Sequence, residues 1–190
     1  MKILVQTGDR PCLKAGRAWA GWLIAFIALS WSAGEASAQA GQIRCGVTEN
    51  GNPARGTIVV EQNGREAAAD SCSGTLSVPP GKYQVTVRVD GVLDNPAKTV
   101  LVEVKEGKTV PVTVDFRTGV IEVRIETQEQ RGTGIVTVNQ LGRRIGTLGL
   151  GVGTHLSAGR YEIIVRLGHD ERRYAVDLKA GQRRLVRARF

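Results

Sequence analysis

Apolar and polar residues alternate along most of the chain after its first forty residues. In residues 82–90, for example, Tyr83, Val85, Val87 and Val89 are separated by polar or charged side chains. Because successive side chains of a strand point to opposite faces, this period predicts β-strands with one buried face. The strands expected in the first half of the chain are residues 43–49, 58–61, 76–78, 82–90, 99–105 and 109–116.

Short turns separate these strands, and no sustained helical period interrupts them. Residues 63–64 (Asn-Gly), 90–91 (Asp-Gly) and 106–107 (Glu-Gly) are dipeptides typical of tight turns. Six or seven short strands within about 75 residues are typical of a compact β-sandwich. The pattern therefore predicts an all-β fold.

The chain contains an internal duplication at an offset of 78 positions. Residues 56–65 (GTIVVEQNGR) align with residues 134–143 (GIVTVNQLGR). At the same offset, residues 79–88 (PPGKYQVTVR) align with residues 157–166 (SAGRYEIIVR). A single register held through both segments without a gap indicates two copies of one structural unit.

The second copy is four residues shorter near its end, so that Phe116 matches Phe190. We therefore expect two tandem β-sandwich domains, at residues 39–117 and 118–190. The join between them, Phe116-Arg-Thr-Gly119, is too short for free movement, so we expect the two domains to touch.

The first 38 residues have the composition of an export signal. Basic residues precede an apolar run over residues 18–29, and small residues follow it. Cleavage after Ala38 or after Ala40 fits the pattern equally well. The alternative is an uncleaved anchor, although the apolar run is shorter than the roughly 20 residues that span a bilayer. Residues 1–38 are thus predicted to be a signal peptide, and the protein to be periplasmic or secreted.

Two cysteines follow the signal, and their even number in an exported chain predicts a disulfide between Cys45 and Cys72. The alternative is a pair of free buried thiols. The repeat offset places Cys45 on Val123 and Cys72 on Leu150. We therefore expect the two strands to meet in the core, through a disulfide in the first copy and an inward Val–Leu contact in the second. The 27-residue separation does not match a redox Cys-x-x-Cys motif.

Positive charge is concentrated in the second copy. Residues 39–116 hold 8 Lys+Arg and 9 Asp+Glu, a net charge of −1, whereas residues 117–190 hold 14 and 7, a net charge of +7. Thirteen of those 14 basic residues are arginine. Strand parity points Val186 and Ala188 inward. The arginines then expected to point outward, on the last strand and on strands that could adjoin it, are Arg166, Arg173, Arg183, Arg187 and Arg189.

An arginine-lined sheet face could bind anionic envelope material, such as lipid phosphates or acidic glycan, or an acidic partner protein of the envelope. Peripheral membrane contact is compatible with this reading. The alternative is a basic, soluble surface whose edge charges prevent strand-to-strand aggregation. Nucleic acid is not an expected partner, because the protein is predicted to be exported and no aromatic side chains are interleaved with the arginines.

The sequence contains no pattern that indicates catalysis, a metal site or a cofactor. His155 and His169 stand alone, each more typical of a solvated surface residue than of a metal ligand. Residues 149–153 (GLGVG) lack the Lys-Ser/Thr of a phosphate loop. Their alternation instead predicts a strand with Leu148, Leu150 and Val152 on one face. A hydrolase with a site between the domains remains only a remote alternative.

A short motif occurs once in each copy. Residues 78–83 (VPPGKY) are followed by Glu106-Gly107, and residues 156–161 (LSAGRY) by Ala180-Gly181. The motif resembles that of PEGA and carboxypeptidase-regulatory-like β-sandwich repeats of the bacterial cell envelope, although neither copy contains Pro-Glu-Gly-Ala itself. The resemblance implies an immunoglobulin-like or prealbumin-like sandwich used for binding or spacing, without catalysis.

Together these patterns predict an exported, non-enzymatic binding module of the cell envelope that engages an anionic component through the second copy. The alternative is a structural spacer or accessory subunit of a surface or secretion assembly, whose exposed edge strands pair with a partner strand.

Overall fold

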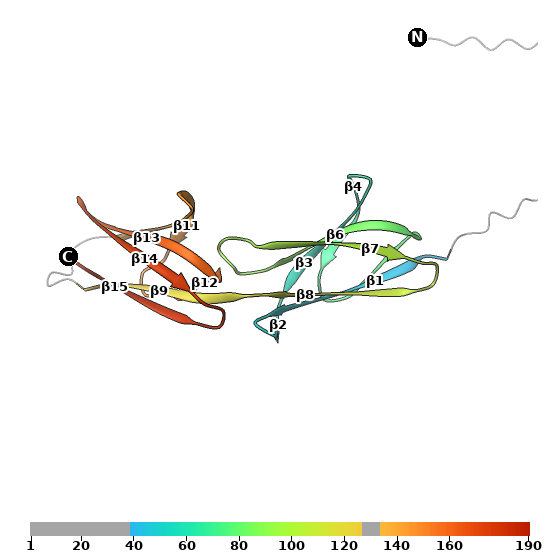
Figure 1. Cartoon of the computed structure of the whole chain (residues 1–190), viewed down its shortest axis with the longest axis horizontal. Helices are drawn as coiled ribbons and strands as arrows, with labels where there is room; N and C mark the ends of the chain where they lie inside the picture. Colours follow the sequence, from blue (N-terminus) through green and yellow to red (C-terminus); the bar gives the residue numbers. More distant parts are fainter. Residues whose placement is uncertain (1–38, 127–133) are drawn as a thin grey trace, which may run out of the picture. The chain divides into compact units, whose positions relative to one another are not determined.

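The structure is a computed structural model that describes residues 39–126 and 134–190, where all regular structure is β (Figure 1). The expected signal peptide lies outside the described residues. The first sandwich contains β1 (Gly41–Glu49), β2 (Asn52–Pro53), β3 (Gly56–Gln62), β4 (Arg65–Ser71), β5 (Thr75–Val78), β6 (Gly81–Val89), β7 (Ala97–Val104) and β8 (Thr109–Phe116). One sheet has the order β4-β3-β6-β7; in the other, β1 pairs with β2, β5 and β8.

The second sandwich repeats this plan with seven strands in the described residues. They are β9 (Thr118–Glu126), β10 (Gly134–Gln140), β11 (Arg143–Leu148), β12 (Thr154–Ser157), β13 (Gly159–Leu167), β14 (Asp170–Leu178) and β15 (Arg183–Arg189). Its sheets have the orders β11-β10-β13-β14 and β12-β9-β15. Each sandwich encloses its own cluster of buried apolar side chains. The prediction of an all-β chain with two tandem sandwiches is confirmed.

Strand parity decides which side chains enter each core. Tyr83, Val85, Val87 and Val89 of β6 are all buried, and the residues between them face outward. Two elements escaped prediction: β2 is very short, and β4 (REAAADS) is an edge strand without an apolar face. The alternation of large apolar and polar residues detects only strands that bury one side.

The strand expected across residues 149–153 is wrong. β11 ends at Leu148, and Gly151 adopts a left-handed φ of 69° within a turn. Leu150 and Val152 are exposed. The glycine-rich segment therefore forms a turn that changes the direction of the chain. A non-glycine residue would adopt the left-handed backbone of Gly151 only at an energetic cost.

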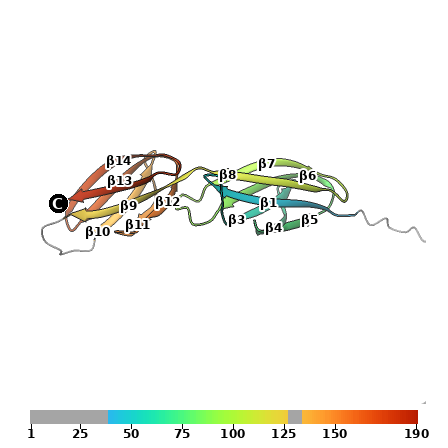
Figure 2. The same ribbon diagram turned by 90° about the horizontal axis from the view of Figure 1, so that it is seen from below.

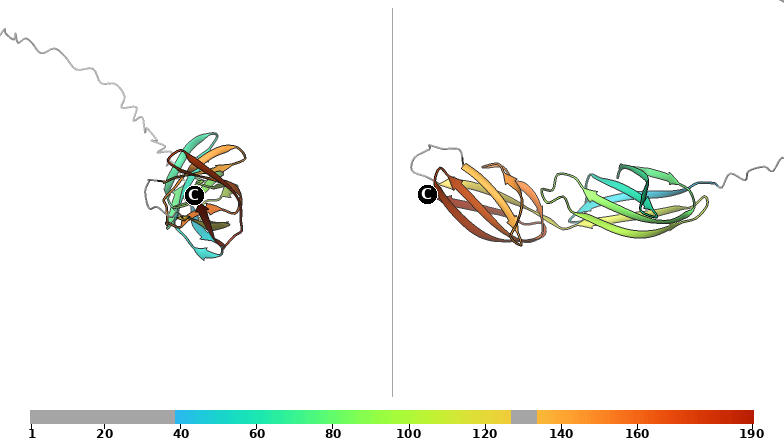
Figure 3. Two further views of the ribbon diagram at one scale, coloured as in Figure 1. Left: turned by 90° about the vertical axis from the view of Figure 1, so that its left-hand side faces the viewer. Right: turned by 90° about the horizontal axis from the view of Figure 1, so that it is seen from above.

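The first and last strands of each sandwich lie side by side and parallel, as Figure 2 shows for β1 and β8. In the first sandwich Cys45 lies opposite Val112, and in the second Val123 lies opposite Val186. These are equivalent positions under the duplication. The same ladder thus closes both sandwiches (Figure 3).

The Gly-x-Tyr motif makes the same hydrogen bond in both copies. The Tyr83 hydroxyl donates to the carbonyl of Pro79 at 2.7 Å, and the Tyr161 hydroxyl donates to the carbonyl of Ser157 at 2.8 Å. Burial raises the pKa of both tyrosines, which keeps the hydroxyls protonated as donors. A Cβ at Gly81 would lie 2.5 Å from the amide nitrogen of Gln62 but only in ordinary van der Waals contact with the Tyr83 ring, at 3.5 Å, so the tyrosine does not itself exclude a side chain at this position.

A cation–π contact also recurs at equivalent positions. Lys98 lies over the ring of Phe116 at 5.5 Å, and Arg172 lies over the ring of Phe190 at 5.4 Å. Each contact links the edge strand of one sheet to the end of the last strand of the other. The copies therefore share contacts that hold their two layers together.

The expected disulfide between Cys45 and Cys72 is present, with the two Cα atoms 5.0 Å apart. At the equivalent place in the second sandwich, Val123 and Leu150 form an isolated parallel bridge. Val123 is buried as expected, but Leu150 is 39% exposed, because the turn around Gly151 carries its side chain to the rim of the core.

Removal of the disulfide is expected to destabilise the first sandwich. Closure of a 27-residue loop contributes about 3–4 kcal/mol in the chain-entropy model. The variant C45S/C72S should lose about that amount, whereas C45V/C72L, which copies the second sandwich, should lose less because it keeps an apolar contact. Denaturant unfolding measures both; equal stability of the disulfide-bonded protein and C45S/C72S would contradict the expectation.

Equivalent hairpins differ at one strained residue. The β3–β4 turn is Asn63-Gly64 and the β10–β11 turn is Leu141-Gly142, and all four residues have positive φ. Asparagine tolerates this conformation, whereas leucine does not. The Leu141 side chain is 97% exposed and so gains little packing in return.

The substitution Leu141→Asn is therefore expected to stabilise the protein by about 1 kcal/mol, and the matched change Asn63→Leu to destabilise it by a similar amount. Thermal unfolding of the two variants checks this. An unchanged or lower midpoint for Leu141→Asn would show that the turn holds no such strain.

Candidate functional site

The structure places the five candidate arginines on two different sheets. Arg183, Arg187 and Arg189 lie on β15, which pairs with β9. Arg166 and Arg173 lie on β13 and β14, in the other sheet of the same sandwich. All five are exposed, as strand parity predicts. The expectation that their strands adjoin in one sheet face is wrong, because β14 pairs with β13 and β15 pairs with β9.

The outer side of β9 and β15 carries a row of charged side chains, which we call the arginine ladder. It consists of Arg124, Arg183, Arg187 and Arg189 together with Glu122 and Glu126. The parallel register sets Arg187 opposite Arg124 and Arg189 opposite Glu126. Alternate residues of each strand therefore present guanidinium and carboxylate groups on one surface. The candidate set missed Arg124, Glu122 and Glu126, although their alternation with Val123 and Ile125 places them outward.

Glu122 is the anchor of this ladder. The residue is only 4% exposed, and its two carboxylate oxygens accept hydrogen bonds from Arg183 at 2.6 Å and Arg124 at 2.7 Å. These hydrogen bonds, first that of Arg183, lower the pKa of Glu122 below its ordinary value. A buried carboxylate held by two guanidinium groups orients both arginines along the sheet.

At the other end of the ladder, Glu126 pairs with both Arg187 and Arg189, at 3.3 and 3.0 Å. The side chain of Arg189 is 81% exposed. A guanidinium group has five N–H donors, so these pairs leave donors directed to solvent. Four arginines face two carboxylates, which gives the ladder a surplus of two positive charges.

The remaining two candidates belong to a neutral cluster. Arg166 and Arg173 both bond Glu171, at 2.6 and 2.8 Å, and Arg173 also approaches Glu162 at 3.4 Å. Two arginines are thus balanced by two carboxylates. Ile164, which lies opposite Arg173 on the same outer face, is nevertheless buried. We infer that the aliphatic parts of these arginine side chains cover Ile164.

The equivalent surface of the first sandwich has different chemistry. Arg183, Arg187 and Arg189 correspond to Thr109, Thr113 and Asp115. There Thr109 donates to Gln42 at 3.0 Å, and Thr48 donates to Asp115 at 2.7 Å. The same strand ladder thus carries short polar side chains in one copy and long basic ones in the other.

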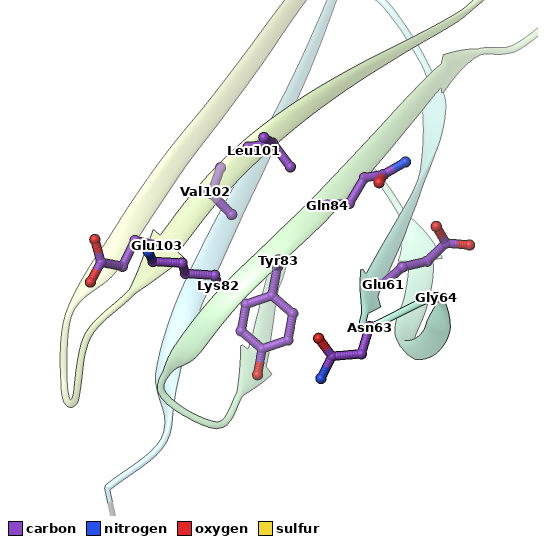
Figure 4. A pocket seen from close by; sticks show the side chains of 9 residues that line it. All are labelled: Glu61, Asn63, Gly64, Lys82, Tyr83, Gln84, Leu101, Val102 and Glu103. Carbon is purple, nitrogen blue, oxygen red and sulfur yellow. The ribbon is translucent and has the colours of Figure 1, made fainter.

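A hollow of about 410 Å³ lies on the first sandwich (Figure 4). Glu61 and the Asn63-Gly64 turn line one part of it, and β6 and β7 line the rest. Its lining holds carboxylates, a lysine and Leu101, but no Ser, Cys or His. The hollow therefore lacks the nucleophile and the histidine base of a hydrolase of the Ser–His or Cys–His type.

Direct contacts join the two sandwiches, and a second hollow of about 300 Å³ lies beside them. Glu49 binds His155 at 2.7 Å and also accepts the Thr118 hydroxyl. Asp94 accepts from the Ser157 amide at 3.0 Å. Thr118 is almost fully buried and its hydroxyl is engaged with Glu49, so it is not presented as a nucleophile.

Within residues 39–126 and 134–190, no three His, Cys, Asp or Glu side chains are grouped to hold a metal ion. The same residues contain no apolar helix of membrane-spanning length.

No protein-family model and no curated protein matches the chain. Solved structures that are similar include the Bacillus anthracis TIE protein, with 14% identity and a TM-score of 0.40 over 80% of this chain and 34% of that one. A candidate adhesin from Bacteroides ovatus has 10% identity and a TM-score of 0.41, over 73% of this chain and 76% of that one.

The major pilin protein T-13 of Streptococcus pyogenes is also similar, with 10% identity and a TM-score of 0.24 over 80% of this chain and 97% of that one. The chain spans about a third of the length of the TIE protein. At these TM-scores the similarities carry no argument about function. The resemblance to PEGA-type repeats stays a prediction.

Glu122 gives the ladder a defined response to acid. Its pKa is lowered in the folded state, so its contribution to stability is complete above the unfolded value of about 4.3 and is lost as the pH falls through the folded value. Glu122→Gln should therefore be less stable than the unchanged protein at neutral pH, and the difference should close in acid. Thermal unfolding at several pH values tests this, with the exposed Glu126→Gln as control; a pH-independent difference would contradict it.

Proposed function

We propose that this protein is an exported, non-enzymatic binding protein of the cell envelope, and that its arginine ladder engages an anionic envelope component. The observation that carries the proposal is the surplus of two positive charges on the outer side of β9 and β15. Phosphate and carboxylate groups fit the planar guanidinium fork.

The geometry of the ladder supports a repeating anionic ligand or surface. Outward residues two apart on a strand are about 7 Å apart, so Arg187 and Arg189 offer a short row of guanidinium groups. Glu126 holds these two side chains, and Glu122 holds Arg124 and Arg183, in place before a ligand arrives. Such preorganisation lowers the entropy lost on binding.

Export is supported by two independent features. The Cys45–Cys72 disulfide persists in oxidising compartments and is rare in the cytosol. The composition of residues 1–38 is that of a signal peptide. Together they direct the ligand search to material outside the cytoplasm.

A second candidate function is that of a rigid spacer in a surface assembly. Only Arg117 lies between β8 and β9, and side chains from both sandwiches bond across this join. A short join with contacts across it would restrict movement between the two modules. The two functions differ in one respect: the spacer needs no charge on the ladder.

The experiment compares two double variants that remove the same charge. R187Q/R189Q leaves the Glu122 anchor intact, whereas R166Q/R173Q changes the neutral cluster. Binding to phosphatidylglycerol-containing vesicles is measured by co-sedimentation. With about 1 kcal/mol per basic residue at an anionic surface, R187Q/R189Q should bind roughly 10- to 30-fold more weakly. The control should lose much less, and added salt should weaken the unchanged protein.

Equal losses in both variants would show that net charge, rather than the ladder, controls binding. Binding by the unchanged protein that is absent or insensitive to salt would favour the spacer. Circular dichroism melting of each variant verifies that its fold is retained.

A further inference from the structure

Equivalent edge strands of the two sandwiches are protected to different degrees. β7 ends the sheet β4-β3-β6-β7, and β14 ends the sheet β11-β10-β13-β14. Charged side chains at a sheet edge discourage pairing with another chain. β14 carries five of them in nine residues, namely Asp170, Glu171, Arg172, Arg173 and Asp177. β7 carries two in eight, Lys98 and Glu103.

Lys98 does not protect the β7 edge. Its ammonium group donates to the carbonyl of Asp115 at 2.5 Å and lies over the ring of Phe116. Both partners belong to β8 or its end, so the side chain is directed into its own sandwich. The middle of the strand, from Thr99 to Val102, is therefore uncharged and rich in residues that favour strands.

Leu101 stands at the centre of this segment and is 85% exposed. It lies opposite Gln84 of β6 on the outer side of the sheet, as Figure 4 shows. The equivalent residue of β14 is Ala175. A large apolar side chain thus occupies the unprotected edge, where the second sandwich has a small one.

We propose that β7 pairs antiparallel with β7 of a second copy of this protein, across a two-fold axis at Leu101. The two four-stranded sheets would then form one continuous sheet. An isologous contact of this kind is closed and stops at a dimer. This inference is independent of the arginine ladder, which lies on the other sandwich.

The register follows from parity and charge. Directly opposed residues of an antiparallel pair share a face, so the axis must pass through a residue. With the axis at Leu101, the Leu101 residues of the two copies face each other, and Val100 of each copy faces Val102 of the other. An axis at Val100 or Val102 would instead set Leu101 against Thr99 or Glu103, leaving the leucines unpaired.

Charge also suits the register at Leu101. Glu103 would face Thr99 of the second copy and lie diagonally from Ala97 of that copy. Arg88 lies opposite Ala97 on β6. Because alanine is small, the side chain of Arg88 can reach over it toward Glu103 of the other copy. The register at Leu101 therefore brings Arg88 of each copy near Glu103 of the other copy, and it places no like charges opposite each other.

The first test is the mass of the purified protein in solution, measured by sedimentation velocity across a dilution series. The unchanged protein should show a reversible dimer, Leu101→Lys should remain a monomer, and the matched edge control Ala175→Lys should retain the dimer. Both substitutions add one charge at an exposed edge position, so neither is expected to unfold the chain. A monomer at every concentration, a dimer that survives Leu101→Lys, or equal loss in Ala175→Lys would each overturn the proposal.

Disulfide trapping tests the register. Facing Cα atoms of an antiparallel pair lie about 4.5–5.5 Å apart, within the range that a disulfide spans. Leu101→Cys should therefore form a covalent dimer on mild oxidation, whereas Thr99→Cys should not, because the two Thr99 positions would lie about four residues apart along the ladder. Equal trapping at both positions, or trapping at Thr99 alone, would overturn the register at Leu101.

Discussion

The parallel pairing of the first and last strands is the interaction on which each sandwich depends. In the first sandwich it joins β1 to β8, and in the second it joins β9 to β15. The paired strands are far apart in sequence. Their pairing closes each sandwich and determines which residues of the two strands share a surface. Arg183 meets Glu122, and Arg187 and Arg189 meet Glu126, only because β15 runs beside β9. The candidate site is thus a consequence of the closing ladder.

Local patterns in the sequence predicted part of the structure, but the long-range pairing of strands could not be predicted from them. Alternation and the 78-residue offset predicted the main strands and their buried faces, because these depend on local period and on equivalence between copies. The even number of cysteines after the expected signal predicted the Cys45–Cys72 disulfide. Parity correctly placed the candidate arginines outward. It could not assign Arg166 and Arg173 to a sheet, since a strand's neighbours are chosen by long-range pairing rather than by its own residues.

The burial of Glu122 also depends on long-range strand pairing and could not be predicted from local alternation. Its outward position follows from the buried Val123 beside it, so the sequence alone favours a solvated carboxylate. Only the structure brings Arg183 to it from a strand 61 residues away, and the two guanidinium groups then cover it. The turn around Gly151 was missed because two apolar residues separated by glycine imitate strand alternation.

The duplicated plan separates what the fold requires from what varies. The tyrosine hydroxyl bond, the cation–π contact and the closing ladder recur in both copies, because each holds the layers or the strand order in place. The solvent-facing residues differ: threonine and Asp115 in the first copy occupy the positions of arginine in the second. The proposed binding function therefore rests on these differences, and the shared framework supports them.

The most direct test of this account is to move the end of the ladder to the other copy. Thr48, Thr113 and Asp115 are equivalent to Glu126, Arg187 and Arg189, so T48E/T113R/D115R introduces the same group on the first sandwich. In a protein whose own ladder is neutralised, this graft should restore salt-sensitive sedimentation with anionic vesicles. A folded graft that fails to sediment with them would show that the arginine arrangement is not sufficient for binding, and would contradict the central claim.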